Sequence, residues 1–388
     1  MTESIKELDG AFVAGTYNRF PLEFVSGKGA LWTAADGREY IDMGSGIGVN
    51  SFGCLDDEWK AAVIEQLGKL QHTSNLYYTE PCARLARLLC EKTGMKKVFF
   101  CNSGAEANEC AIKVARKYAA DKKGEGHSTV ITMQNSFHGR TLTTLAATGQ
   151  DHYHELFQPL TPGFVSTPPN DIAALENAVR DYSPAAIMLE CIQGEGGVNV
   201  LDKAFVQAAA RLAKEQDIVL IIDEVQTGNG RTGRLYSYMH YGIEPDVVST
   251  AKGLGGGLPL GATLMGEKVQ KVLGFGDHGS TFGGNPVCCA GAVSILSRLT
   301  DAFMAEVAEK SRYVFDELSS APGVQSVSGI GLMIGIKPEK AAGDVVKTCM
   351  ENGVLCLTAK DKVRLLPPLN IPMDVLAKAV AVIKAALA

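Results

Sequence analysis

Short apolar runs alternate with helical patterns through the middle of the chain. Runs rich in Val and Ile, such as Ile218–Ile222 and Val247–Thr250, are typical of strands buried on both faces of a parallel sheet. The other predicted strands are Lys97–Cys101, Thr129–Met133 and Ala185–Glu190. Helical periodicity occurs at Leu85–Thr93, Ala105–Ala120 and Ala204–Glu215. This succession predicts an α/β fold with an open, mainly parallel sheet flanked by helices.

The two ends of the chain follow a different pattern. Residues 24–49 alternate apolar and turn residues, and Asp36-Gly37 marks a hairpin turn. Beyond about residue 300 the pattern predicts helices and short strands, with strands near Val324–Val327 and Leu332–Ile336 and a helix at Ala341–Glu351. We therefore predict three parts: an N-terminal segment (1–56) that joins a small domain, a large α/β domain (57–290), and a small α+β domain (291–388).

Composition narrows the class of protein. A chain of 388 residues, 46% of them hydrophobic, can bury a full core. The net charge of −6, without a basic stripe, argues against a nucleic-acid or anionic-membrane partner. No apolar run approaches the roughly twenty residues that span a bilayer, and the first residues lack the apolar core of a signal peptide. The ten cysteines include no CxxC pair, and the histidines lack metal-ligand spacing. We expect a cytoplasmic protein with reduced thiols and no metal site.

A carboxylate and an amine follow two of the predicted strands. Asp223 ends the first apolar run, and Lys252 follows the second among several glycines. Functional groups of parallel sheets gather where strands end. A lysine there can hold the aldehyde of pyridoxal phosphate as a Schiff base, and an aspartate can keep its pyridine nitrogen protonated. From this segment alone, a capping Asp223 and a solvated Lys252 explain the pattern equally well.

A possible phosphate cradle lies between a predicted strand and helix. Ser103-Gly104-Ala105 would place backbone N–H groups and a hydroxyl at a helix N-terminus, where unsatisfied donors and the helix dipole favour an anion. The alternative is an ordinary Ser N-cap with Glu106 in the capping-box position. GxxxxGK[ST] is absent, and the glycines of 253–257 do not match a dinucleotide-binding GxGxxG.

Six motifs in order carry a resemblance to a known family. They are FFCNSGAEANE, NSFHGRT, QGEGG, IIDEVQTGNGRTG, STAKGLGGGLPLGA and GSTFGGNP. Together they resemble the class III aminotransferases, which share the aspartate-aminotransferase-like fold of pyridoxal-phosphate-dependent transferases. The resemblance implies a large domain with a seven-stranded sheet, a smaller α+β domain and pyridoxal 5'-phosphate as cofactor. It also implies that Lys252 binds the cofactor and shuttles a proton, that Asp223 faces the ring nitrogen, and that Gln226 lies on the ring hydroxyl side.

Further cofactor contacts follow from the same resemblance. Phe137 resembles the aromatic residue that stacks on the cofactor ring; otherwise it is a core Phe. Thr281 matches a threonine that reaches the phosphate bound by the neighbouring subunit, which implies a homodimer with shared sites; otherwise it is a turn hydroxyl. We assign no chemistry to His138.

The resemblance also implies two carboxylate clamps and a switch. Arg364 resembles the arginine that grips the α-carboxylate of glutamate and 2-oxoglutarate, and Arg140 one that binds the distant carboxylate of an ω-amino donor. Glu195 resembles the glutamate that pairs with the Arg364 position until glutamate arrives. The alternatives are solvated arginines and an ordinary loop glutamate. Ser280, Tyr17, Asn75 and Tyr78 lie in segments that resemble the family's substrate-facing parts.

Within the family, HTSNLYYTEP, FHGRT and CIQGEGGV are most similar to N-acetylornithine aminotransferases of arginine biosynthesis. Ornithine δ-, succinylornithine and 4-aminobutyrate aminotransferases are the nearest alternatives. SFGCLDDEW departs from the Gly-His-…-His-Pro stretch of relatives, which leaves the role of residues 52–59 open. Two other classes stay open. An aminomutase would need no 2-oxoglutarate, and a non-enzymatic scaffold would have little reason to keep Lys252 and Asp223 together.

Overall fold

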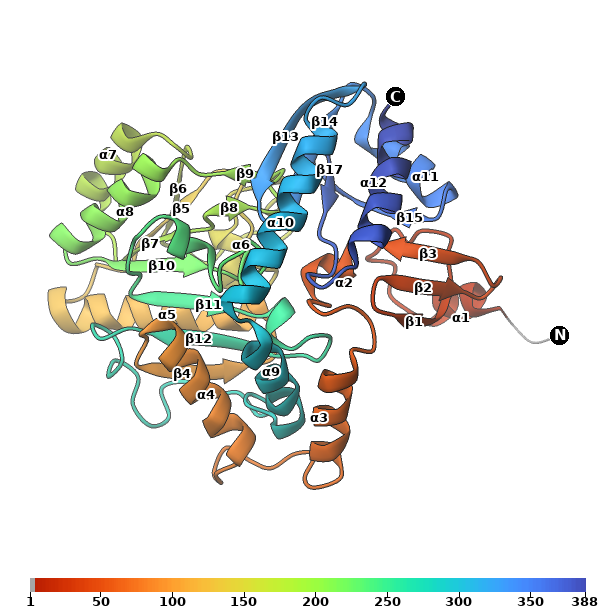
Figure 1. The fold of residues 1–388 in the computed structure, drawn as a ribbon. Helices are drawn as coiled ribbons and strands as arrows, with labels where there is room; N and C mark the ends of the chain where they lie inside the picture. The colour runs from red at the N-terminus through yellow and green to blue at the C-terminus, as the bar shows by residue number, and fades with distance from the viewer. Residues whose placement is uncertain (1–3) are drawn as a thin grey trace.

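A seven-stranded sheet forms the centre of the computed structural model, which describes residues 4–388 (Figure 1). Its strand order is β4-β12-β11-β10-β7-β5-β6. The bounds are β4 (Lys97–Cys101), β5 (Val130–Met133), β6 (Phe164–Thr167), β7 (Ala186–Leu189), β10 (Val219–Asp223), β11 (Val247–Thr250) and β12 (Gly261–Met265). β12 runs antiparallel to both of its neighbours, and the other pairs are parallel. The predicted mainly parallel, seven-stranded α/β fold is confirmed.

Alternate residues of each central strand enter two different cores. Val219 and Ile221 of β10 pack in the core under α5 (Gly104–Lys123). Leu220 and Ile222 face the other side, where the core includes residues of α4 (Glu80–Thr93), α7 (Ile172–Tyr182), α8 (Lys203–Glu215) and α9 (Pro286–Arg298). Burial on both faces explains the unbroken apolar runs. Strands β6 and β12 were not predicted, although they are as long as the central strands that were.

The chain ends build two smaller sheets beside the central one (Figure 1). One has the order β1-β2-β3-β15, and the other β13-β14-β17-β16. Their strands are β1 (Phe24–Lys28), β2 (Leu31–Ala34), β3 (Glu39–Asp42), β13 (Val324–Ile330), β14 (Met333–Pro338), β15 (Val354–Leu355), β16 (Leu357–Ala359) and β17 (Lys362–Leu365). β3 pairs in parallel with β15, so the two ends of the chain share one sheet.

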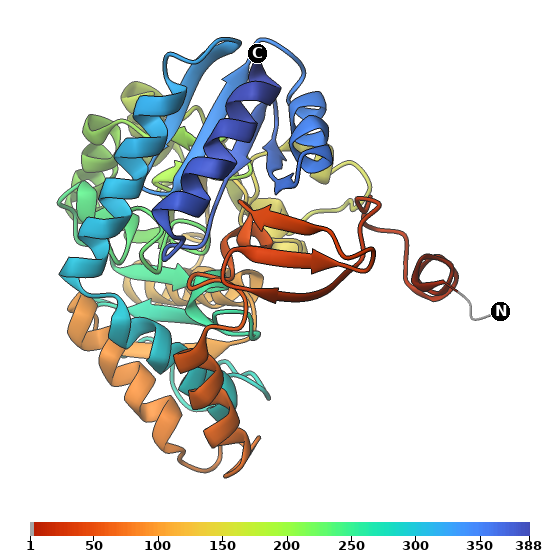
Figure 2. The same cartoon turned by 45° about the vertical axis from the view of Figure 1, so that its right-hand side comes forward.

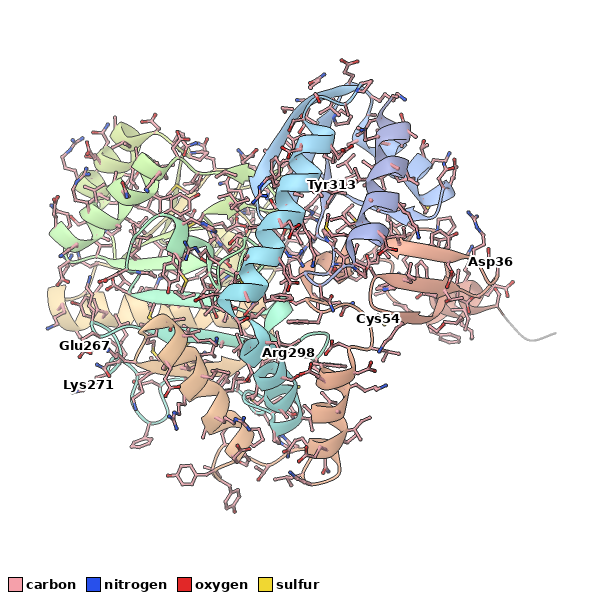
Figure 3. The ribbon with its side chains drawn as sticks, in the orientation of Figure 1. Asp36, Cys54, Glu267, Lys271, Arg298 and Tyr313 are labelled. Atoms are coloured by element: carbon pink, nitrogen blue, oxygen red, sulfur yellow. The ribbon has the colours of Figure 1, made fainter. Side chains whose placement is uncertain are left out.

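The predicted hairpin joins β2 and β3. Thr33 pairs with Glu39, and Asp36 stands at the outer tip of the turn (Figure 3). Gly37 has φ +84°, a left-handed value that glycine adopts without a steric cost. This turn chemistry explains why the sequence located the hairpin correctly.

The remaining helices surround these sheets. They are α1 (Ile5–Phe12), α2 (Ser45–Gly48), α3 (Asp57–Leu67), α6 (Leu142–Ala147), α10 (Asp301–Leu318), α11 (Ala342–Glu351) and α12 (Met373–Leu387), with 3-10 turns at Asp151–Tyr153, Ser237–His240 and Lys252–Leu254 and a short ribbon of β8 (Ile192–Gln193) and β9 (Asn199–Val200). α1 has no buried residue and stands apart from the body (Figure 2). Within residues 4–388 no single helix is long and apolar enough to cross a membrane; α9 and α10 pass that test only as a pair bent by 77°.

Candidate active site

A cavity of about 540 Å³ lies where the parallel strands end. Its lining follows β4, β5, β7, β10 and β11 in turn, as expected for an open α/β sheet. The residues singled out by the sequence analysis that line it are Tyr17, Ser103, Gly104, Ala105, Phe137, Arg140, Asp223, Gln226 and Lys252. The fold thus brings together segments that are up to 235 residues apart, from Tyr17 to Lys252.

The Asp223 carboxylate is held in one orientation by three groups. Its Oδ2 accepts a hydrogen bond from Asn108 Nδ2 at 2.7 Å and pairs with His138 Nδ1 at 2.8 Å. Its Oδ1 accepts one from Val225 N at 3.0 Å. Asp223 and His138 are both buried, so these bonds compensate for the lost hydration of the carboxylate. The arrangement presents a fixed negative charge at the cavity wall.

Lys252 enters the cavity immediately after β11. Its φ of +43° is left-handed, a conformation that non-glycine residues adopt at a cost of about 1–2 kcal/mol. Such strain is found where the side chain must point in one direction. Burial is the main cause that lowers the pKa of the Lys252 amine, and the Glu195 and Asp223 carboxylates oppose it only in part. A lowered pKa suits an amine that must take up and release a proton.

The start of α5 is also part of the cavity lining. Ser103 Oγ accepts the N–H of Glu106 at 3.2 Å and donates to Glu106 Oε2 at 3.0 Å, so the capping arrangement is present. The first N–H groups of the helix, at Gly104 and Ala105, have no acceptor within the helix and border the cavity. A Cβ at Gly104 would lie 2.6 Å from Val225 Cγ1, so only glycine permits this close approach.

An aromatic and basic group forms one wall. The Phe137 ring meets Tyr153 edge-on with centroids 5.7 Å apart. The Arg140 guanidinium lies 5.9 Å from the Phe137 centroid and 4.7 Å from that of Tyr153. These contacts fix Phe137 and leave Arg140 exposed at the edge of the cavity.

Glu195 and Arg364 form an ion pair next to Gln226. Arg364 Nη1 lies 2.5 Å from Glu195 Oε1 and 3.1 Å from Gln226 Oε1, and Gln226 Nε2 donates to Glu195 Oε1 at 3.0 Å. Burial acts to raise the pKa of Glu195, but the charge and hydrogen bond of Arg364 and the bond from Gln226 outweigh it, so the pKa is lowered. Arg364 is therefore masked by a carboxylate of the protein itself.

Besides Glu195 and Arg364, which contact the lining residue Gln226 without lining the cavity themselves, four predicted residues lie outside the cavity lining. Asn75 Nδ2 donates to the backbone oxygens of Ser280 and Gly283, at 2.9 and 3.0 Å, and Asn102 Nδ2 donates to Ser280 Oγ at 3.1 Å. Asn102 lines the cavity, so this loop is connected to its edge. Thr281 and Tyr78 are exposed. The roles given to these four residues stay predictions.

Sequence reasoning missed two residues of the site and gave His138 no role. Asn108 stands one helical turn beyond Gly104, so it faces the same side of α5. Glu190 follows β7 directly, and the pairing of Ile222 with Leu189 places it beside Asp223. Burial raises the pKa of Glu190 to about 7; His138 counteracts this and Asp223 adds to it. The rule that functional groups follow parallel strands could have identified Glu190.

These groups fit pyridoxal phosphate. The free N–H groups at Gly104 and Ala105, at the start of a helix that borders the cavity, suit a phosphate. The oriented Asp223 carboxylate suits a protonated ring nitrogen, and Lys252 suits an aldehyde. Phe137 offers an aromatic surface within the same cavity. The site thus has a partner for each polar end of that cofactor.

Comparison with known proteins gives a consistent result. The family model described as "Aminotransferase class-III" matches residues 12–387. An acetylornithine aminotransferase of Haemophilus ducreyi is 52% identical over 98% of both chains. The crystal structure of N-acetylornithine aminotransferase from Stenotrophomonas maltophilia has a TM-score of 0.85 and 34% identity, covering 98% of this chain and 97% of that one. An ornithine aminotransferase structure from Toxoplasma gondii, with pyridoxal phosphate at partial occupancy in its active site, has a TM-score of 0.93 and 32% identity, covering 99% and 94%.

Proposed function

The chain belongs to the class III aminotransferases, which depend on pyridoxal phosphate, and from that premise we propose that it transfers the δ-amino group of N-acetylornithine to 2-oxoglutarate. The observation that carries the proposal is the masked arginine clamp, in which Glu195 pairs with Arg364 and both contact Gln226 in the cavity lining. A transaminase binds two substrates in turn, and these two differ in where their carboxylate lies relative to the reacting amine. An arginine clamp that opens only for 2-oxoglutarate or glutamate, and stays closed for N-acetylornithine, would let one cavity accept both substrates.

When bound, pyridoxal phosphate withdraws electrons from the substrate carbon next to the transferred nitrogen. The residues of the chain supply the rest of the chemistry. Lys252, with its lowered pKa, takes a proton from that carbon and returns one during the exchange. Asp223, oriented by Asn108 and His138, would face the ring nitrogen of the cofactor with its carboxylate. The N–H groups at the start of α5 would hold the phosphate.

The substrate assignments follow from charge. Arg140, exposed at the mouth of the cavity, would bind the carboxylate of N-acetylornithine, which is remote from the reacting amine. Arg364 would bind the α-carboxylate of glutamate or 2-oxoglutarate after Glu195 moves away. Tyr17, at the edge of the same cavity, would contact the substrate chain. Similarity to acetylornithine aminotransferases at 52% and 46% identity supports N-acetylornithine over the alternative donors.

We also propose a homodimer with shared sites, in the cytoplasm. Large apolar and aromatic side chains are exposed near the loop that carries Thr281, among them Leu76, Tyr78, Phe275 and Phe282. A set of exposed apolar side chains of this size is typical of an interface between subunits. Covering this region would bring Thr281 to a neighbouring site. The ten cysteines are all free, which suits a reducing compartment.

Glutamate formation from 2-oxoglutarate tests the proposed function. The purified protein, supplied with pyridoxal phosphate, should use N-acetylornithine with a higher kcat/KM than ornithine, N-succinylornithine or 4-aminobutyrate. A preference for another donor would retain the aminotransferase and replace the substrate. Turnover that needs no 2-oxoglutarate would indicate an amino-group migration within one molecule instead.

A further inference from the structure

Glu190 has no part in the proposed reaction, yet it lies among the residues that do. It is 5% exposed, follows β7 directly and lines the cavity. Its neighbour on the adjacent strand end is Asp223. Two carboxylates side by side repel each other, so a buried glutamate in this place needs a compensating role or compensating partners.

Its partners are two backbone N–H groups from separate loops. Glu190 Oε1 accepts a hydrogen bond from Phe137 N at 2.9 Å, and Oε2 accepts one from Gly194 N at 3.3 Å. A backbone N–H can only donate, so both side-chain oxygens must accept. Glutamate offers an acceptor oxygen at both positions, whereas glutamine, the side chain of the same length, offers only one.

Each of the two loops carries a different part of the site. The first holds Phe137, at the aromatic wall, and His138, which pairs with Asp223. The second holds Gly194, whose added Cβ would lie 2.3 Å from Gln226 Oε1, and then Glu195, which masks Arg364. One carboxylate therefore connects the cofactor-facing wall to the carboxylate clamp.

We infer that Glu190 is a positioning residue that holds the Glu195 loop in the clamp-closed arrangement and couples it to the Phe137 wall. The inference rests on the proposed function, because it assigns the residue that keeps Arg364 masked during the amine half-reaction. Releasing Gly194 N would free the loop, so Glu195 would leave Arg364 more readily. The kcat/KM of the glutamate half-reaction would then rise relative to that of the amine half-reaction.

Glu190→Gln is the variant that tests this link. The amide oxygen can keep the shorter bond to Phe137 N, and the NH2 group then faces Gly194 N–H with no acceptor. The ratio of kcat/KM for glutamate to that for N-acetylornithine should rise about tenfold, the effect of losing one hydrogen bond to a charged group. Equal slowing of both half-reactions would overturn the inference, because a merely structural residue would change both alike.

Glu224→Gln is the matched control. Glu224 is also a buried carboxylate at the same sheet edge, accepting hydrogen bonds from Ser237 Oγ at 2.7 Å, Tyr238 N at 2.9 Å and the Thr227 hydroxyl. A glutamine can keep all three contacts, because the Thr227 hydroxyl can reverse its direction and accept. This variant should leave the half-reaction ratio unchanged.

A double-mutant cycle with Glu195→Ala shows whether Glu190 acts through Glu195. In that background Glu190→Gln should no longer change the ratio, and a full tenfold change there would refute the coupling. Hydrogen exchange of the cofactor-free protein gives a second readout. Amides of 193–197 should exchange faster in Glu190→Gln than in wild type or Glu224→Gln, and equal rates would overturn the link.

The inference can still be tested if Glu190→Gln does not fold or if the wild type does not use these substrates. If Glu190→Gln does not fold, Glu190→Asp retains the charge but shortens the reach, and it should give the same changes in smaller measure. If wild type uses neither substrate, the proposed function fails, and hydrogen exchange alone decides whether Glu190 holds the Glu195 loop.

Discussion

Removal of Glu195 should both destabilise the protein and change its substrate preference. Arg364 is 3% exposed, and its Nε has no partner within the described residues. In Glu195→Ala its guanidinium would keep only the bond to Gln226 Oε1. Loss of one partner of a buried pair costs about 3–5 kcal/mol. The Glu195 side chain is 26% exposed, which lets water reach the vacated space, so we expect about 3 kcal/mol.

The same change unmasks the clamp. Glutamate would no longer compete with an internal carboxylate that makes a charge-assisted hydrogen bond worth about 1.5–3 kcal/mol, which corresponds to roughly 10–100-fold in kcat/KM. An unpaired Arg364 would also repel the cationic amine donor. Stopped-flow rates of the two half-reactions should therefore show a rise of at least about tenfold in the glutamate to N-acetylornithine ratio.

Asp56→Asn controls for the loss of an ion pair as such. Asp56 Oδ1 lies 2.7 Å from Arg298 Nη2, with side chains 15% and 19% exposed, and Arg298 projects from α9 (Figure 3). Asparagine keeps the cap on α3, where Asp56 accepts from Trp59 N, because Asn caps as well as Asp does. This variant should be less stable than the wild type, but its ratio of glutamate to N-acetylornithine rates should be unchanged. An unchanged ratio in Glu195→Ala, despite its lower stability in urea, would refute the masking argument.

Three further predictions concern other parts of the protein. Lys252→Ala should remove the visible absorbance of the bound cofactor and nearly all turnover, and retained transamination would exclude it as the proton carrier. Burial raises the pKa of Glu224 to about 6 from 4.5, so its contribution to stability is present below about pH 4.5 and lost as the pH rises through 6. When the pH rises from about 4 to 7, the free energy of unfolding of the wild type, measured in urea, should fall by about 2 kcal/mol relative to that of Glu224→Gln. If the two proteins lose stability in parallel with pH, this pKa is wrong. Tyr78→Asp should shift sedimentation from dimer toward monomer and lower activity, whereas an unchanged dimer would place the interface elsewhere.

By itself the sequence determined five of the seven central strands, the hairpin at Asp36 and the positions of Gly104, Asp223 and Lys252 at or just after strand ends. Each has a local signal. Buried strands read as apolar runs, the turn needs its glycine, and strand ends of a parallel sheet converge on one edge whatever the details of packing. Strand β12 (GATLM) begins with Gly, Ala and Thr and so lacks the Val- and Ile-rich run that marks a buried strand, and its antiparallel direction depends on its neighbours in the sheet.

Only the tertiary structure decided which side chains meet. Glu195 and Arg364 are 169 residues apart, and the bond from Phe137 N to Glu190 spans 53. No local pattern encodes such contacts, because they depend on strand order and on how the smaller sheets pack against the central sheet. The same holds for the parallel pairing of β3 with β15, which joins the two ends of the chain. Residue type and spacing thus located the chemical groups, while packing set their distances, their burial and therefore their pKa values.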